Sequence, residues 1–262
     1  MHKKLTVILL TVLVFLSAAL VGISSVFRIE DVSLTASVVT DAAKAEAEEL
    51  QTRLRAAYDK QISFFADEEE AEEILSDFPY FRMISFTKSY PDKIVIVVKE
   101  DAEVYAVSCE GAEGQYYILG ADGTVLGIRD SYVNRLDGAA NVLLKGLTVA
   151  GTRGGKLSGD DCLTTMLAVC EKMSSLPIEL RRNVVSVEVF ARNPEIIFKV
   201  TMREGVVVYI GNPKTMTEEK TEAAITKYLS LTDAQKLTGR IAVSDKEGQL
   251  IVAYSEKDEF SK

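Results

Sequence analysis

Histidine and cysteine are scarce in this sequence of 262 residues, and their scarcity excludes several kinds of chemistry. The single histidine, His2, lies at the N-terminus, so a histidine-based catalytic triad or histidine metal site is excluded from the rest of the chain. The three cysteines, Cys109, Cys162 and Cys170, are odd in number and lack CxxC spacing. They therefore give little support to a disulfide framework or a zinc site, and we expect Cys162 and Cys170 to pack in a helix.

Positive charge is also in deficit, because 39 acidic residues outnumber 30 Lys and Arg residues and leave a formal net charge of −9. Binding of nucleic acid requires clustered Lys and Arg side chains, and the sequence contains no such cluster. The acidic runs at residues 46–49 and 67–73 fall on the polar faces of predicted helices, which indicates solvated surface rather than a carboxylate catalytic site. We therefore expect no nucleic-acid partner and no catalytic residues.

A hydrophobic run without a charge occupies residues 5–27. As a helix it would extend roughly 34 Å, enough to cross a bilayer. The preceding basic residues predict a cytoplasmic tail at residues 1–4, and hence a single-pass signal anchor with the later domains extracellular or periplasmic. A cleaved signal peptide is the alternative, since Ser17, Ala18 and Ala19 are small, but the apolar run continues past them.

Residues 28–101 predict a small α+β domain. A strand is expected at residues 28–34, a helix that Asp41 caps, and a second helix that Asp67 caps. Two strands at residues 83–88 and 93–99 flank a turn at residues 89–92, in which proline and aspartate favour a hairpin. The expected order is strand, helix, helix, strand, strand, with both helices on one face of the sheet.

Residues 102–254 predict a second, mostly antiparallel β domain with two or more helices. Strands are expected at residues 103–108, 115–119, 124–128, 184–190, 195–202, 206–210, 240–244 and 250–254, with turns at Asp122-Gly123 and at residues 246–248. Ser158 and Thr217 are expected to open helices. A glycine-rich segment at residues 151–159 lacks the spacing of a phosphate-binding loop and predicts a flexible turn. Residues 255–262 predict a flexible tail.

Four stretches of the sequence carry a family resemblance. The most specific is residues 88–100, KSYPDKIVIVVKE, with a basic residue, a turn proline, an alternating strand and a glutamate; residues 27–32, 117–126 and 143–147 add to it. Together with the order of parts, they resemble the FtsQ/DivIB family of bacterial cell-division proteins. The resemblance implies a signal anchor, a POTRA domain and a β domain. We expect no cofactor. The chain departs from the family at Asp101, where arginine is common, and at residues 242–244, where Ala-Val-Ser replaces Asp-Leu-Arg.

The last predicted strand is the candidate partner-binding site, because it is apolar, lacks proline and ends the domain. The resemblance implies that a small coiled-coil membrane protein of the division septum adds a strand there. The candidate contact residues are Gln249, Leu250, Ile251, Val252, Ala253 and Tyr254. The hypothesis is a non-catalytic scaffold located at the septum. The alternatives are a membrane-anchored envelope enzyme or wall-binding module, and, less favoured, a POTRA component of a secretion machine.

Overall fold

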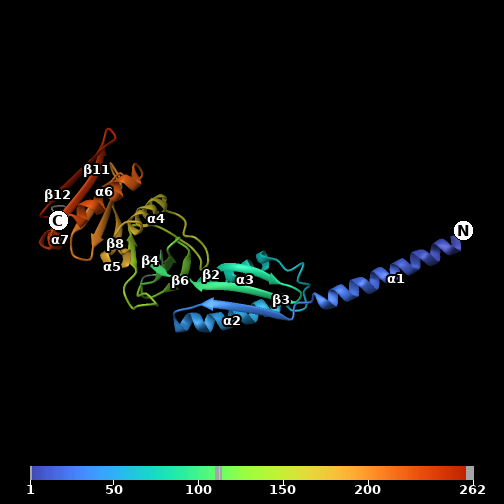
Figure 1. Cartoon of the computed structure of the whole chain (residues 1–262). Helices are drawn as coiled ribbons and strands as arrows, with labels where there is room; N and C mark the ends of the chain where they lie inside the picture. Colours follow the sequence, from blue (N-terminus) through green and yellow to red (C-terminus); the bar gives the residue numbers. More distant parts are fainter. Residues whose placement is uncertain (1, 110–111, 113, 258–262) are drawn as a thin grey trace. The chain divides into compact units, whose positions relative to one another are not determined.

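The computed structural model describes residues 2–109, 112 and 114–257, with the side chains of these residues apart from 2–9, 19, 20 and 23. The chain divides into two compact units, Met1–Asp101 (unit 1) and Ala102–Lys262 (unit 2). Each unit contains helices and a sheet (Figure 1), so the fold class is α+β. Residue 1 of the expected tail at 1–4, and residues 258–262 of the expected tail at 255–262, lie outside the described residues.

The hydrophobic run forms most of the N-terminal helix α1 (His2–Val26). In the described part of the chain, no helix is both long and apolar enough to cross a membrane. By this finding the expectation of a transmembrane helix at residues 5–27 is wrong.

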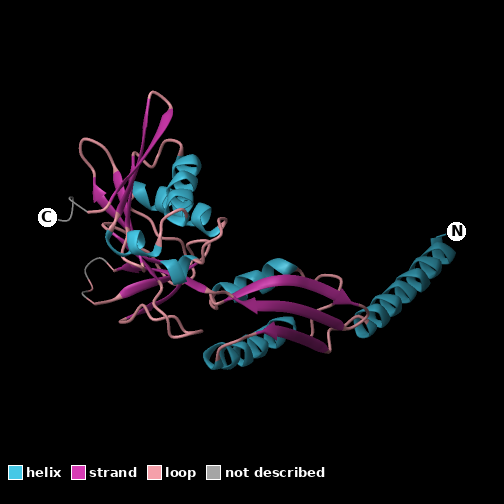
Figure 2. Cartoon of the chain, turned by 60° about the vertical axis from the view of Figure 1, so that its left-hand side comes forward, coloured by secondary structure: helices cyan, strands magenta, loops and turns pink. Residues whose placement is uncertain are grey.

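Unit 1 has the expected order of strand, helix, helix, strand, strand. Its elements are β1 (Asp31–Ser37), α2 (Asp41–Tyr58), α3 (Glu68–Ser76), β2 (Phe81–Ser89) and β3 (Lys93–Glu100). β3 is the central strand, parallel to β1 and antiparallel to β2, and Figure 2 shows the three strands as a curved sheet accompanied by the helices. The two helices connect β1 to β2, and a tight hairpin connects β2 to β3. This connection allows β1 to lie beside β3 and parallel to it.

The helix starts of unit 1 are set by side-chain caps. Asp67 caps α3 as predicted, since its carboxylate accepts from the backbone N–H of Glu70 at 3.1 Å. The prediction of Asp41 as the cap of α2 is wrong, because Thr40 takes that position. The Thr40 hydroxyl accepts from a backbone N–H of the first turn and donates to Glu100 Oε1 at 2.7 Å. Thr40 therefore ties the start of α2 to the end of β3, which the local sequence does not show.

One hydrophobic core fills unit 1. It combines the apolar stripes of both helices with the alternate side chains of the sheet, as the sequence periodicity predicts. Its fully buried members include Leu50, Leu54, Ile94, Ile96 and Val98. The helices and the sheet therefore stabilise one another as a single layer pair.

Unit 2 is built on one nine-stranded sheet. Its strands are β4 (Glu103–Ser108), β5 (Tyr116–Gly120), β6 (Val125–Arg129), β7 (Val142–Lys145), β8 (Val184–Ala191), β9 (Ile197–Met202), β10 (Val207–Gly211), β11 (Arg240–Lys246) and β12 (Gln249–Ser255). Their order is β12-β11-β10-β9-β8-β7-β4-β5-β6. Five of the eight neighbouring strand pairs are antiparallel. The sheet is nevertheless mixed, because β7 is parallel to β4 and to β8, and β10 is parallel to β11. β7 was not among the predicted strands, because its four residues are too few to show a strand period.

Four helices accompany this sheet within the described residues: α4 (Asp161–Ser174), α5 (Leu180–Asn183), α6 (Thr217–Leu229) and α7 (Asp233–Thr238). α4 and α6 contribute to one core with the strands. Cys162 and Cys170 are buried in α4, which confirms that they pack in a helix. α6 and α7 form the crossover between β10 and β11, and this crossover is what makes those two strands parallel.

Candidate functional site at the C-terminal sheet edge

β12 is an edge strand of the large sheet, and within residues 114–257 its strand partner is β11 (Figure 1). The two strands pair antiparallel along the whole of β12, without a bulge. A two-residue turn of Glu247 and Gly248, both with positive φ, joins them, as hairpins with a right-handed twist require. An edge strand presents a row of N–H and C=O groups away from its neighbour, to which another chain can add.

The side chains of β12 form two rows, because successive residues of a strand point to opposite faces. Leu250, Val252 and Tyr254 share one face, and Ile251 lies on the other. Leu250, Ile251 and Val252 are 38%, 46% and 39% exposed, respectively, and Gln249 and Ala253 are also exposed. Five of the six predicted contact residues are therefore accessible on the described surface.

Tyr254, the sixth predicted contact residue, packs within its own unit. Its hydroxyl donates to the backbone carbonyl of Gln235 in α7 at 3.3 Å, and the Lys227 ammonium lies 5.9 Å from the centre of its ring. A Cβ placed at Gly239 would lie only 2.5 Å from that ring, so glycine is required there. Tyr254 thus anchors the C-terminal end of β12, while the half from Gln249 to Val252 makes the exposed edge.

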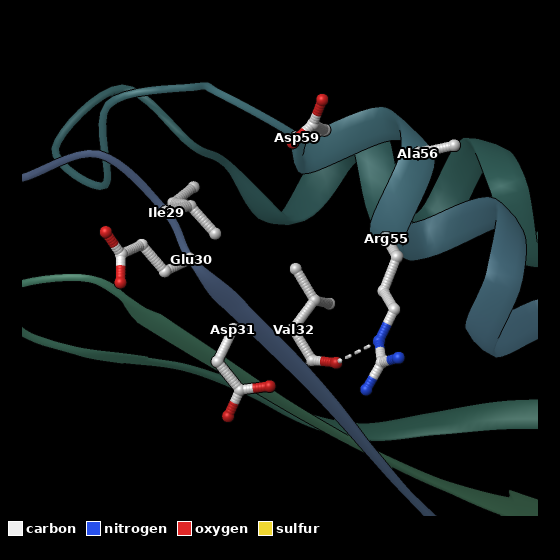
Figure 3. A pocket seen from close by; sticks show the side chains of 7 residues that line it. All are labelled: Ile29, Glu30, Asp31, Val32, Arg55, Ala56 and Asp59. Atoms are coloured by element: carbon white, nitrogen blue, oxygen red, sulfur yellow. Dashed lines mark hydrogen bonds between the residues drawn. The ribbon is translucent and has the colours of Figure 1, made fainter.

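The edge of unit 1 at β1 is closed by side chains of α2. Gln51 Oε1 accepts from the backbone N–H of Leu34 at 2.9 Å, and Gln51 Nε2 donates to the carbonyl of Val32 at 2.6 Å. Arg55 Nε donates to the same carbonyl at 3.4 Å, across a hollow of about 560 Å³ (Figure 3). The Gln51 amide therefore makes the two bonds that an added strand would make, and such a strand would have to displace it.

The edge of unit 2 at β6 is covered by the glycine-rich segment predicted as a turn. Val125 donates its backbone N–H to the carbonyl of Gly155 at 2.9 Å, and Gly154 donates to the carbonyl of Val125 at 2.8 Å. Lys156 Nζ holds this segment in place through Asp122 Oδ2 at 2.6 Å. Residues 151–159 thus cover the start of β6, a role that the sequence does not reveal.

The remaining edge strand, β2, carries the features that discourage pairing. Its register shifts at a bulge between Met83 and Ser85, and its sequence includes Arg82 and Lys88. Bulges and basic side chains are two ways in which proteins protect sheet edges. β12 has no bulge and no charged residue, and no described segment is paired along its outer side. It is therefore the least protected of the four edges.

The cap of α4 is Asp160, so the expectation that Ser158 opens this helix is wrong. The Asp160 carboxylate accepts from the backbone N–H of Cys162 at 2.9 Å and pairs with Arg192 Nη2 at 2.7 Å. Burial opposes ionisation of Asp160, but these hydrogen bonds outweigh it and hold the pKa of the carboxyl below its usual value. No group of three or more His, Cys, Asp or Glu side chains in the described ranges could hold a metal ion.

Sequence reasoning missed two polar residues that shape the sheet edges. Lys220 is buried in α6, and it shares a helical stripe with Ala224 and Tyr228 at spacings of four residues. A charge on an otherwise buried stripe was the signal that could have identified it. Gln51 had no such signal, because its partners lie on a strand seventeen and nineteen residues away.

Comparison of the sequence with models of known protein families gives no match, and no curated protein matches it either. The four sheet edges and the resemblance of residues 88–100 are therefore the features that bear on function.

Proposed function

We propose that this chain is a non-catalytic scaffold of the bacterial division machinery, which acts outside the cytoplasm and binds other division proteins at the septum. The observation that carries the proposal is the contrast between β12, an uncharged and regular edge strand, and three edges that side chains, a covering segment or a bulge protect. The resemblance to the FtsQ/DivIB family supports a small coiled-coil division protein as the partner that adds a strand.

Strand addition at β12 suits both the backbone and the side chains of this edge. The main-chain groups supply affinity, and the alternate side chains supply specificity. Covering the exposed fractions of Leu250, Ile251 and Val252 contributes about 2–4 kcal/mol. A micromolar complex requires roughly 8 kcal/mol. Backbone pairing and contacts beyond the strand must therefore supply at least half of the binding free energy.

Site-specific cross-linking in dividing cells tests this proposal. The photoreactive residue benzoylphenylalanine replaces Ile251 in the full chain, and in a control chain it replaces Ile128 of β6. The two isoleucines are matched, because they are 46% and 45% exposed on opposite edges of the same sheet. We expect an adduct with a coiled-coil division protein from position 251 and none from position 128, together with midcell fluorescence of a tagged chain.

Two outcomes contradict the proposal. Equal adducts from positions 251 and 128 would show that the β12 edge is not selective. A purified chain that converts a cell-envelope substrate would contradict the non-catalytic role.

A further inference from the structure

Lys220 of α6 is 0% exposed, and its ammonium group lies among four oxygen acceptors. They are Asp245 Oδ1 at 2.6 Å, the carbonyls of Asn212 and Gly211 at 2.8 and 2.9 Å, and Thr215 Oγ1 at 3.0 Å. An ammonium group has three protons to donate, so these acceptors satisfy it fully. The hydrogen bond from Lys220 also holds the pKa of Asp245 below its usual value.

These contacts join three parts of unit 2 at one buried point: α6, the segment after β10, and β11. The segment after β10 contains Asn212 and Met216 with positive φ, a conformation that residues with a Cβ rarely adopt unless their surroundings hold it. Two of the four acceptors, the Asn212 carbonyl and Thr215 Oγ1, lie in this segment. Lys220 thus helps to hold the backbone that begins α6, as well as the strand beside it.

Asp245 connects this buried point to the candidate site, because it lies opposite Leu250 in the β11–β12 register. The far half of the hairpin receives little from the core, since Ser244 and Lys246 on either side of Asp245 are exposed, as is the facing part of β12. The near half is held by Tyr254 on α7. Beyond the pairing of residues 240–243 with β10, the side chains of Tyr254 at one end and Asp245 at the other therefore hold the hairpin.

We infer that Lys220 is a positioning residue for the partner-binding edge: by holding Asp245 it orients the exposed half of β12 for strand addition. The inference rests on the proposed function of β12. We call the ion pair between Lys220 and Asp245 the tie. Removing one member of a buried ion pair leaves the other charge without compensation, so a single substitution breaks the tie. Without the tie, the half of β12 from Gln249 to Val252 separates from the rest of unit 2 more often. A partner strand then has fewer ordered backbone groups with which to pair.

Hydrogen exchange of the full chain tests the tie directly. In Asp245→Asn, we expect the β12 amides that pair with β11 to exchange about tenfold faster or more, as loss of a hydrogen bond between charged groups allows. The amides of β8 and β9 should keep their wild-type rates. The matched control is Asp137→Asn, which removes the ion pair between Asp137 and Arg181 elsewhere in unit 2 and should leave hairpin exchange unchanged.

The same variants, combined with the cross-linker at position 251, connect the tie to binding. We expect Asp245→Asn to lower the adduct yield about tenfold and Asp137→Asn to preserve it. Lys220→Met should behave like Asp245→Asn; if it fails to fold, the aspartate variant remains decisive. Unchanged hairpin exchange in Asp245→Asn, or equal acceleration in Asp137→Asn, overturns the inference. A wild-type chain that gives no adduct overturns the proposed function instead, and the exchange data then separate that failure from a failure of the tie.

Discussion

Replacing Ile251 by lysine should weaken partner binding at β12 while leaving the free chain folded. Ile251 is 46% exposed on the face of β12 opposite to Leu250 and Val252, and its neighbour across the hairpin is Ser244. A charged residue at an edge strand opposes strand addition, and lysine is the residue that proteins most often use for this purpose. Substitutions of exposed residues usually change the free energy of unfolding by about 0.5 kcal/mol or less.

The size of the effect follows from the exposed fraction of the side chain. Complete burial of an isoleucine contributes about 1.5–3 kcal/mol, so covering the remaining half in the complex contributes about 1 kcal/mol. Lysine forfeits this term, together with the cross-strand contact of a β-branched side chain with the added strand, which contributes up to about 1 kcal/mol more. Together these terms weaken binding by about 1–2 kcal/mol, which corresponds to a loss of affinity of roughly 5- to 30-fold.

The assay is the dissociation constant for the division protein that cross-links to position 251, measured by biolayer interferometry on purified full chains. Ile128→Lys is the control, because Ile128 has the same exposure on an edge whose start residues 154–155 already cover. We expect Ile128→Lys to bind as the wild type does. If Ile251→Lys retains wild-type affinity, or if both variants lose affinity equally, the β12 edge is not the binding surface.

Four further predictions concern the rest of the structure. Gln51→Ala removes the amide that covers the β1 edge, so we expect concentration-dependent self-association, measured by size-exclusion chromatography with light scattering; an unchanged elution would refute it. Leu54→Ala should destabilise unit 1 by about 2–5 kcal/mol and leave the calorimetric transition of unit 2 in place. The hydrogen bonds from Arg181 hold the pKa of Asp137 below its usual value, so their stabilisation is complete above the ordinary carboxyl pKa of about 3.9 and is lost as the pH falls through the lowered folded value. Asp137→Asn should therefore flatten the loss of stability in acid, measured by urea unfolding. Burial raises the pKa of the Cys170 thiol to about 12, so iodoacetamide at about pH 8 should modify Cys170 only in the unfolded chain.

Local features of the fold could be predicted from the sequence because neighbouring residues determine them. The five-element order of unit 1, the cap at Asp67 and the turn before Gln249 depend on residues within a few positions of one another. The burial of Cys162 and Cys170 followed from helical spacing alone. In each case the physical cause is a hydrogen bond or an apolar stripe inside one element.

Predictions failed where long-range pairing decided the outcome. The first strand was expected at residues 28–34 and lies at Asp31–Ser37, because its register is set by β3, which follows it by about sixty residues. β7 was missed because four residues show no period, and its two parallel neighbours are distant in sequence. The cap of α2 moved to Thr40 because Glu100 at the end of β3 holds that hydroxyl. The prediction of a transmembrane helix at residues 5–27 failed for a different reason, because no described helix is both long and apolar enough to cross a membrane.

By itself, the sequence determined the composition of the candidate edge: an uncharged, proline-free last strand with a turn before it. Only the tertiary structure decided that this strand ends the sheet, that Gln51 and residues 151–159 cover two other edges, and that Lys220 reaches Asp245. The physical reason is that the character of a strand depends on its own residues, whereas the freedom of its outer hydrogen-bonding groups depends on which distant segments lie beside it.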